Sequence, residues 1–112
     1  MTYLSILAIL LLLLYFFPIT FVKGDSMLPT YKDKQLLFSR RVFKFDELEI
    51  SSCYVVWEPC EERKLMIKRL AKIAIDSEGR EMCYFLGDNS RVSFESRSFG
   101  WVPRESIVAK IM

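Results

Sequence analysis

"KLMIKRLAKIAI" (64–75), "DSEGR" (76–80) and "EMCYFLG" (81–87) form the continuous stretch that decides the fold. The two outer segments are short and rich in apolar, β-branched and aromatic residues, as strands are. The polar segment between them is typical of a hairpin connection, with Gly79 available for a positive φ angle. The stretch therefore predicts a β-hairpin.

Other segments of the same kind lie on both sides of this hairpin. They are "QLLFSRRV" (35–42), "SSCYVVWE" (51–58) and "ESIVAKI" (105–111). "FDELE" (45–49) is a polar connection, and residues 87–100 form a long loop rich in Ser, Asn and Gly, of a length that is usually functional or mobile in a compact domain. We therefore expect a mainly β protein with a small, strongly curved antiparallel fold.

Length and charge limit the remaining possibilities. The chain has 112 residues and a net charge of +2, and its first 22 residues carry no charged side chain. The 90 residues that follow (112 − 22) are enough for one domain with a single modest core. Because no concentrated basic stripe or nucleic-acid-binding motif is present, we expect no nucleic-acid partner.

The chain contains no histidine, which excludes Ser-His-Asp triads, Cys-His pairs and HExxH zinc sites. Cys53, Cys60 and Cys83 lack CxxC spacing, so we expect buried thiols and neither a metal nor a cofactor. A disulfide between Cys53 and Cys60 stays open if the domain is extracytoplasmic.

The N-terminal segment predicts a membrane anchor. Thr2 to Val22 supply 21 helix-compatible positions, about 31 Å of helix, which is enough to cross a bilayer core. A cleavable signal peptide fits less well, because the charged n-region is missing and the apolar segment is too long. We therefore expect a single-pass anchor (1–22) and a folded domain (23–112), with a kink near Pro18.

The orientation of this anchor is open at the sequence level. All flanking basic residues follow the anchor, so the positive-inside rule places the domain in the cytoplasm. That rule concerns short loops, and a domain of this size can translocate despite its charges.

Ser26, in "GDSMLPT" (24–30), is a candidate nucleophile that needs a base. Without histidine, that base would be a lysine whose pKa of about 10.4 falls by roughly 2 units through burial. Lys68 shares a strand face with Met66 and Leu70, although Arg69 fits the opposite face equally well. From spacing alone, an exposed edge-strand lysine and an ordinary turn serine are the commoner interpretations.

Three motifs occur in order behind the apolar segment: "GDSMLPT" (24–30), "IKR" (67–69) and "GDNSRVSFESRSFGWVP" (87–103). Together they resemble the type I signal peptidases, membrane-bound Ser-Lys endopeptidases. The resemblance implies Ser26 as nucleophile, Lys68 as general base, and Ser93 as the residue that orients the lysine amine. It also implies an ion pair between Glu95 and Arg97. Gly24 stands where some members carry a hydroxyl, so the backbone N–H of Ser26 would be the main oxyanion donor.

The resemblance implies a cell-membrane protein with an extracytoplasmic catalytic domain. It would cut signal peptides from exported preproteins delivered by a secretion translocon. Three departures are visible: Glu95 replaces the usual Asp, and the chain continues after "KR" as "LAKIAIDSEG" (70–79) where the family usually has a glycine-rich turn. In addition, only 17 residues separate Arg69 from Gly87, which leaves no room for the large second β-domain of many members. Two alternatives are an inactive, membrane-tethered accessory protein of pilus or secretion assembly, and a self-cleaving cytoplasmic regulator of the same Ser-Lys class.

Overall fold

The computed structural model describes residues 2–59, 64–89 and 100–112. In these ranges one α-helix is followed by seven β-strands and one 3-10 turn. Their bounds are α1 Tyr3–Phe16, β1 Ile19–Phe21, β2 Leu36–Arg41, β3 Cys53–Trp57, β4 Leu65–Ile75, β5 Glu81–Leu86, β6 Val102–Pro103, η1 Arg104–Ser106 and β7 Ile107–Ile111. All five strands expected from the sequence are present.

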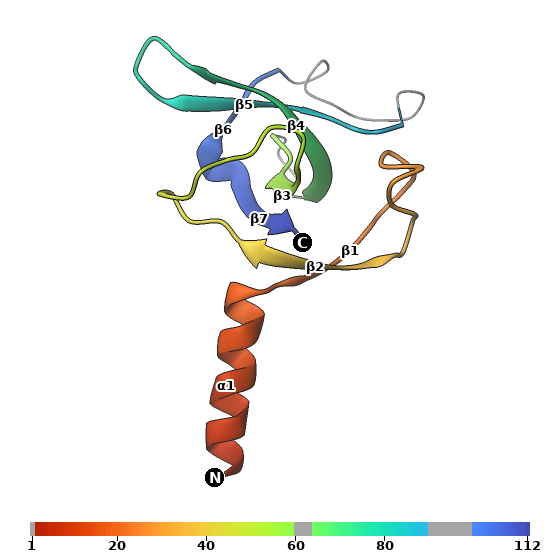
Figure 1. Cartoon of the computed structure of the whole chain (residues 1–112), viewed down its shortest axis with the longest axis vertical. Coiled ribbons are helices and arrows are strands. Elements are labelled where there is room, and N and C mark those ends of the chain that lie inside the picture. The colour runs from red at the N-terminus through yellow and green to blue at the C-terminus, as the bar shows by residue number, and fades with distance from the viewer. Residues whose placement is uncertain (1, 60–63, 90–99) are drawn as a thin grey trace.

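The strands form one antiparallel sheet in the order β1-β2-β7-β3-β4-β5-β6. The sheet curls into a half-barrel, and α1 projects away from it (Figure 1). The predicted mainly β, curved antiparallel fold is confirmed.

The hairpin of β4 and β5 is the longest paired element of the sheet. Its turn places Gly79 at φ 80°, as the sequence predicted. The Asp76 carboxylate accepts the N–H groups of Glu78 and Arg80 at 2.9 and 2.8 Å, which closes the turn. The register shifts between Leu70 and Lys72, a bulge that bends β4. This single bent strand therefore joins the two halves of the curled sheet.

Two hydrophobic clusters fill the fold, one on each face of β3. Tyr54 and Val56 lie in one cluster with Leu70 and Phe85, while Val55 lies in the other with Met27 and Ile67. A strand buried on both faces has a continuous apolar sequence, as "CYVVW" has. Because Met27 belongs to a cluster, the core itself anchors the loop that carries Ser26.

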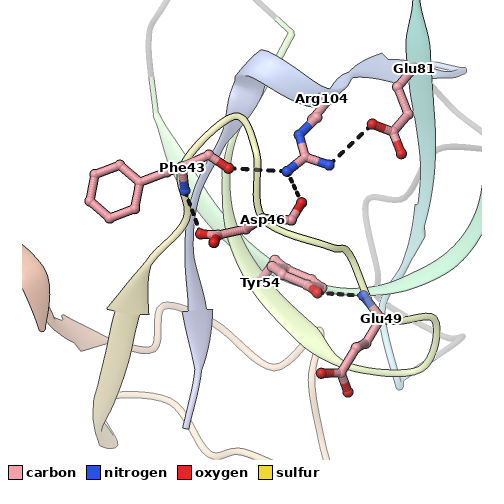
Figure 2. A network of polar contacts seen from close by, with 6 residues as sticks. All are labelled: Phe43, Asp46, Glu49, Tyr54, Glu81 and Arg104. Carbon is pink, nitrogen blue, oxygen red and sulfur yellow. Dashed lines mark hydrogen bonds and ion pairs between the residues drawn. The ribbon is translucent and has the colours of Figure 1, made fainter.

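A nearly buried arginine fixes the connection between β2 and β3 (Figure 2). The Arg104 guanidinium donates to the carbonyl groups of Phe43 and Asp46, and pairs with Glu81 at 3.1 Å. The Tyr54 hydroxyl accepts the N–H of Glu49 at 2.8 Å in the same region. These bonds hold the connection against the cluster that contains Tyr54.

The N-terminal segment differs from the expected anchor. The helix has 14 residues, about 21 Å of length, and ends at Phe16. Pro18 has no N–H and disfavours helical geometry in the residue before it, so the helix stops there. The Pro18 carbonyl instead accepts the N–H and hydroxyl of Ser39 at 3.0 and 2.6 Å, and Ile19–Phe21 pairs with β2.

The expected continuous helix from Thr2 to Val22 is therefore wrong over its last third. Within the described residues, no helix combines the length and the apolar character that crossing a membrane requires. Every residue of α1 is exposed, and none is charged.

Candidate active site

The loop after β1 presents Ser26 in a defined conformation. Gly24 adopts φ 79°, a conformation that favours glycine, and its N–H donates to the Asp33 carboxylate at 2.7 Å. Leu28 N–H closes a turn onto the Asp25 carbonyl at 3.2 Å. Met27 is only 1% exposed, so the core holds the residue that follows Ser26. Ser26 itself is half-buried at the surface of this loop.

Lys68 lies in β4 opposite Tyr54 of β3, and its residue is 3% exposed. Burial lowers the pKa of this amine because it penalises the charged form, and the nearby Glu58 carboxylate opposes the shift. The sequence left open whether Lys68 is a dry or a solvated lysine. The structure shows that the Lys68 side chain is buried.

Ser26 and Lys68 line the same groove, whose volume is about 810 Å³. The structure thus brings together two residues that lie 42 positions apart (68 − 26). Across the described part of the chain, the backbone N–H of Ser26 donates no hydrogen bond. The residues that line the groove therefore include a serine hydroxyl, a buried lysine and a backbone N–H group that donates no hydrogen bond within the described part of the chain.

The long walls of the groove are strand edges. β4 pairs with β5 only from Arg69 onward, so Leu65–Lys68 has no strand partner on that side among the described strands. Hydrogen bonds from Glu58 N–H to Lys64 O and from Leu70 N–H to Ser52 O show that even-numbered residues bond toward β3. The main-chain groups of Leu65 and Ile67 therefore face the open side.

β1 mirrors this arrangement on the opposite wall. It pairs with β2 through even-numbered residues: Val22 N–H donates to Gln35 O, and Pro18 O accepts from Ser39. The main-chain groups of Ile19 and Phe21 therefore face away from β2. Both residues line the groove.

A polar network that the sequence reasoning missed connects the two site elements. Arg69, next to Lys68, donates to the Asp88 carboxylate at 2.9 and 2.7 Å and to the Ser51 carbonyl at 2.5 Å. Thr30 donates its hydroxyl to the same carboxylate at 2.5 Å. The hydrogen bond from Arg69 lowers the pKa of Asp88, and burial partly opposes this shift. The sequence signal for this ion pair was the presence of an arginine, Arg69, in the second motif and an aspartate, Asp88, in the third.

Asn89, the neighbour of Asp88, contacts the Ser26 loop directly. Its N–H donates to the Ser26 carbonyl at 2.8 Å, and its side-chain amide donates to the Asp25 carbonyl at 3.0 Å. Asp88 and Asn89 therefore fix the distance between the Ser26 loop and the strand that carries Lys68.

Several predicted residues lie outside the described ranges. Ser93, Glu95, Arg97 and Cys60 are among them, so their expected roles stay predictions. Cys53 and Cys83 are buried and carry free thiols. The pairing of Cys53 with Cys60 that the sequence left open involves a residue outside the described ranges, so it stays untested. Burial raises the pKa of Cys53, and raises that of Cys83 to about 11. In the described ranges, no cluster of Cys, Asp and Glu side chains could hold a metal ion.

No protein-family model matches this chain, and no curated protein matches it. Functional assignment therefore depends on the chemistry of the groove. A hydroxyl, a desolvated amine and a free N–H donor are the groups that serine acyl transfer requires without histidine.

Proposed function

We propose that this protein is a serine endopeptidase that cleaves N-terminal signal peptides from exported proteins, with Ser26 as nucleophile and Lys68 as general base. One observation carries the proposal: the buried amine of Lys68 and the hydroxyl of Ser26 line the same groove. A desolvated lysine is neutral over a wider pH range and can accept a proton.

In the proposed reaction, neutral Lys68 takes the Ser26 proton while Oγ attacks the scissile carbonyl carbon. The tetrahedral intermediate places its negative charge on the former carbonyl oxygen, which the Ser26 N–H stabilises. The C–N bond then breaks, the leaving amine takes the proton from Lys68, and an acyl ester remains on Ser26. Water, deprotonated by the same amine, hydrolyses this ester and restores both residues.

The strand edges of the groove favour an extended peptide as the substrate. Peptides commonly bind by adding a strand to an exposed sheet edge, with main-chain bonds giving affinity and alternate side chains entering pockets. Here Leu65 and Ile67 offer main-chain groups on one wall, and Ile19 and Phe21 offer them on the other. In this proposal the substrate strand lies between β1 and β4, with its scissile bond beside Ser26.

The proposal extends to the cell membrane, with the β-domain on the extracytoplasmic side. An uncharged helix with no buried residue exposes more apolar surface than water-facing helices normally do, and lipid is the partner that suits such a surface. In this setting the substrates would be preproteins that arrive from a secretion translocon. Ser93 would orient Lys68, and Glu95 would pair with Arg97.

The test uses a leader-bearing substrate and matched variants. We expect Ser26→Ala and Lys68→Arg to lower kcat by roughly 10³-fold or more, because guanidinium cannot deprotonate at usable pH. Ser77→Ala in the exposed hairpin turn and Lys72→Arg at an exposed position of β4 should keep wild-type rates. A Lys68→Arg variant with wild-type activity would refute the dyad.

A second candidate is a binding protein that holds an extended peptide without cutting it. The two open strand edges favour it, because they supply main-chain bonds without any catalytic group. In that case Ser26→Ala would leave the cellular role intact, whereas a catalytic role would be lost.

A further inference from the structure

The peptide unit between Asp25 and Ser26 determines where the proposed oxyanion donor points. A trans peptide is planar, with its C=O and N–H pointing in opposite directions. The Asp25 carbonyl accepts two hydrogen bonds, from Leu28 N–H at 3.2 Å and from the Asn89 side-chain amide at 3.0 Å. Because this carbonyl is fixed, the direction of the Ser26 N–H is fixed as well.

The peptide unit on the other side of Ser26 is held by the same residue. Asn89 N–H donates to the Ser26 carbonyl at 2.8 Å. The two peptide planes that flank the Ser26 Cα atom are therefore both bonded to Asn89. Their relative orientation sets φ and ψ of Ser26, and hence also the direction in which its Cα–Cβ bond leaves the backbone.

Asn89 is itself held in place through its neighbour in the sequence. Its neighbour Asp88 is held by Arg69 of β4 and by Thr30. Arg69 follows Lys68 in the same strand. The hydrogen bonds from Asn89 to the Ser26 loop are therefore connected, through Asp88 and Arg69, to the strand that carries the proposed base. Ser26, Asp25 and Lys68 are among the residues that line the groove, and Asn89 is not among them.

We propose that Asn89 is a positioning residue that aims the Ser26 N–H into the groove as the oxyanion donor. This inference rests on the proposed peptidase function. It assigns to Asn89 the orientation of the Ser26 backbone, a role that neither Ser26 nor Lys68 fills. Only an amide of this length suits the position: aspartate has the same shape but cannot donate a hydrogen bond, and it would place a charge against the Asp25 carbonyl.

The kinetic test compares Asn89→Asp and Asn89→Ala with Gln35→Ala, an amide-removing control in a neighbouring turn. Direct removal of an oxyanion donor costs about 10²–10³-fold in kcat, so a misaimed donor should cost about 10–100-fold. KM should change less than about threefold, and the midpoint of the acidic limb in the pH profile should not move, since Lys68 is untouched. Peptide affinity measured in a Ser26→Ala background should also stay constant.

A second readout is independent of turnover. The ¹⁵N order parameter of the Ser26 amide should fall from the rigid range near 0.85 toward 0.6 in Asn89→Ala. An unchanged order parameter, or an unchanged kcat in an active enzyme, would overturn the inference. A parallel loss of kcat, peptide affinity and Tm would also overturn it, because that pattern indicates a general structural role. If the wild-type protein cleaves nothing, the proposed function fails, and the order parameter still decides whether Asn89 clamps the loop.

Discussion

Replacement of Lys68 by methionine should remove activity and stabilise the fold. Methionine has nearly the same length and an apolar end, so it fits the space of a residue that is 3% exposed. The amine it replaces loses hydration on folding, and burial lowers its pKa. The wild-type chain therefore carries an energetic cost at Lys68 that the variant does not carry.

The size of this cost follows from the pKa shift. Each unit by which the folded pKa of Lys68 lies below the unfolded value of about 10.4 destabilises the folded state by about 1.36 kcal/mol at low pH. For a domain of this size that corresponds to about 5–10 °C in Tm per unit. Between the two pKa values the unfolded chain binds more protons, so the free energy of unfolding rises with pH. Above about pH 10.4 the lysine is neutral in both states, and the cost disappears.

The assay is thermal or urea unfolding of wild type and Lys68→Met across this pH range, with Lys72→Met as an exposed control in the same strand. We expect the advantage of Lys68→Met to be largest at low pH and to vanish above about pH 10.4. Wild-type kcat/KM should rise with pH through the same lowered pKa. A Lys68→Met variant less stable than wild type at every pH would show that Lys68 is charged and well paired, and would refute the reasoning.

Two further changes test the surroundings of the site. Asp88→Asn should cost about 1 kcal/mol of unfolding free energy, because it weakens a charge-assisted pair with a partly exposed arginine. Since Arg69 lowers the pKa of Asp88, urea unfolding should show this difference at neutral pH and lose it as the pH falls through that lowered pKa; a constant difference would contradict the assignment. Leu70→Ala, at a fully buried position, should cost about 2–5 kcal/mol, whereas Ile75→Ala at an exposed position of the same strand should cost far less; equal losses in urea unfolding would contradict the described core.

The strands could be predicted because their signals are local. Short apolar segments and a polar turn containing Gly79 indicate a hairpin without reference to any distant residue. β1 was missed because Ile19–Phe21 continues an apolar segment without a change in composition. Pro18 was a signal, but a proline kink and a helix end have the same sequence signature. Only pairing with β2 distinguishes them.

The site could be predicted only in part, because some of its residues have a local sequence signal and others do not. Ser26 and Lys68 were found from residue chemistry and motif order, although strand alternation gave Arg69 an equal claim to the buried face. The tertiary packing decides which of the two side chains is buried. Thr30 and Asn89 act through bonds that span 58 and 64 positions, and no local pattern encodes contacts at such separations.

The strand edges of β1 and β4 that line the groove lack a partner among the described strands, and this also bears on how the protein behaves at high concentration. An uncovered edge accepts any extended chain, including a strand from a second copy, and long flat edges nucleate aggregates for this reason. Within the described ranges, β1 has three residues, and the part of β4 without a strand partner on its outer side is limited to Leu65–Lys68. Strand edges this short can bind a few residues of an extended peptide, but they are too short to template the growth of a fibre.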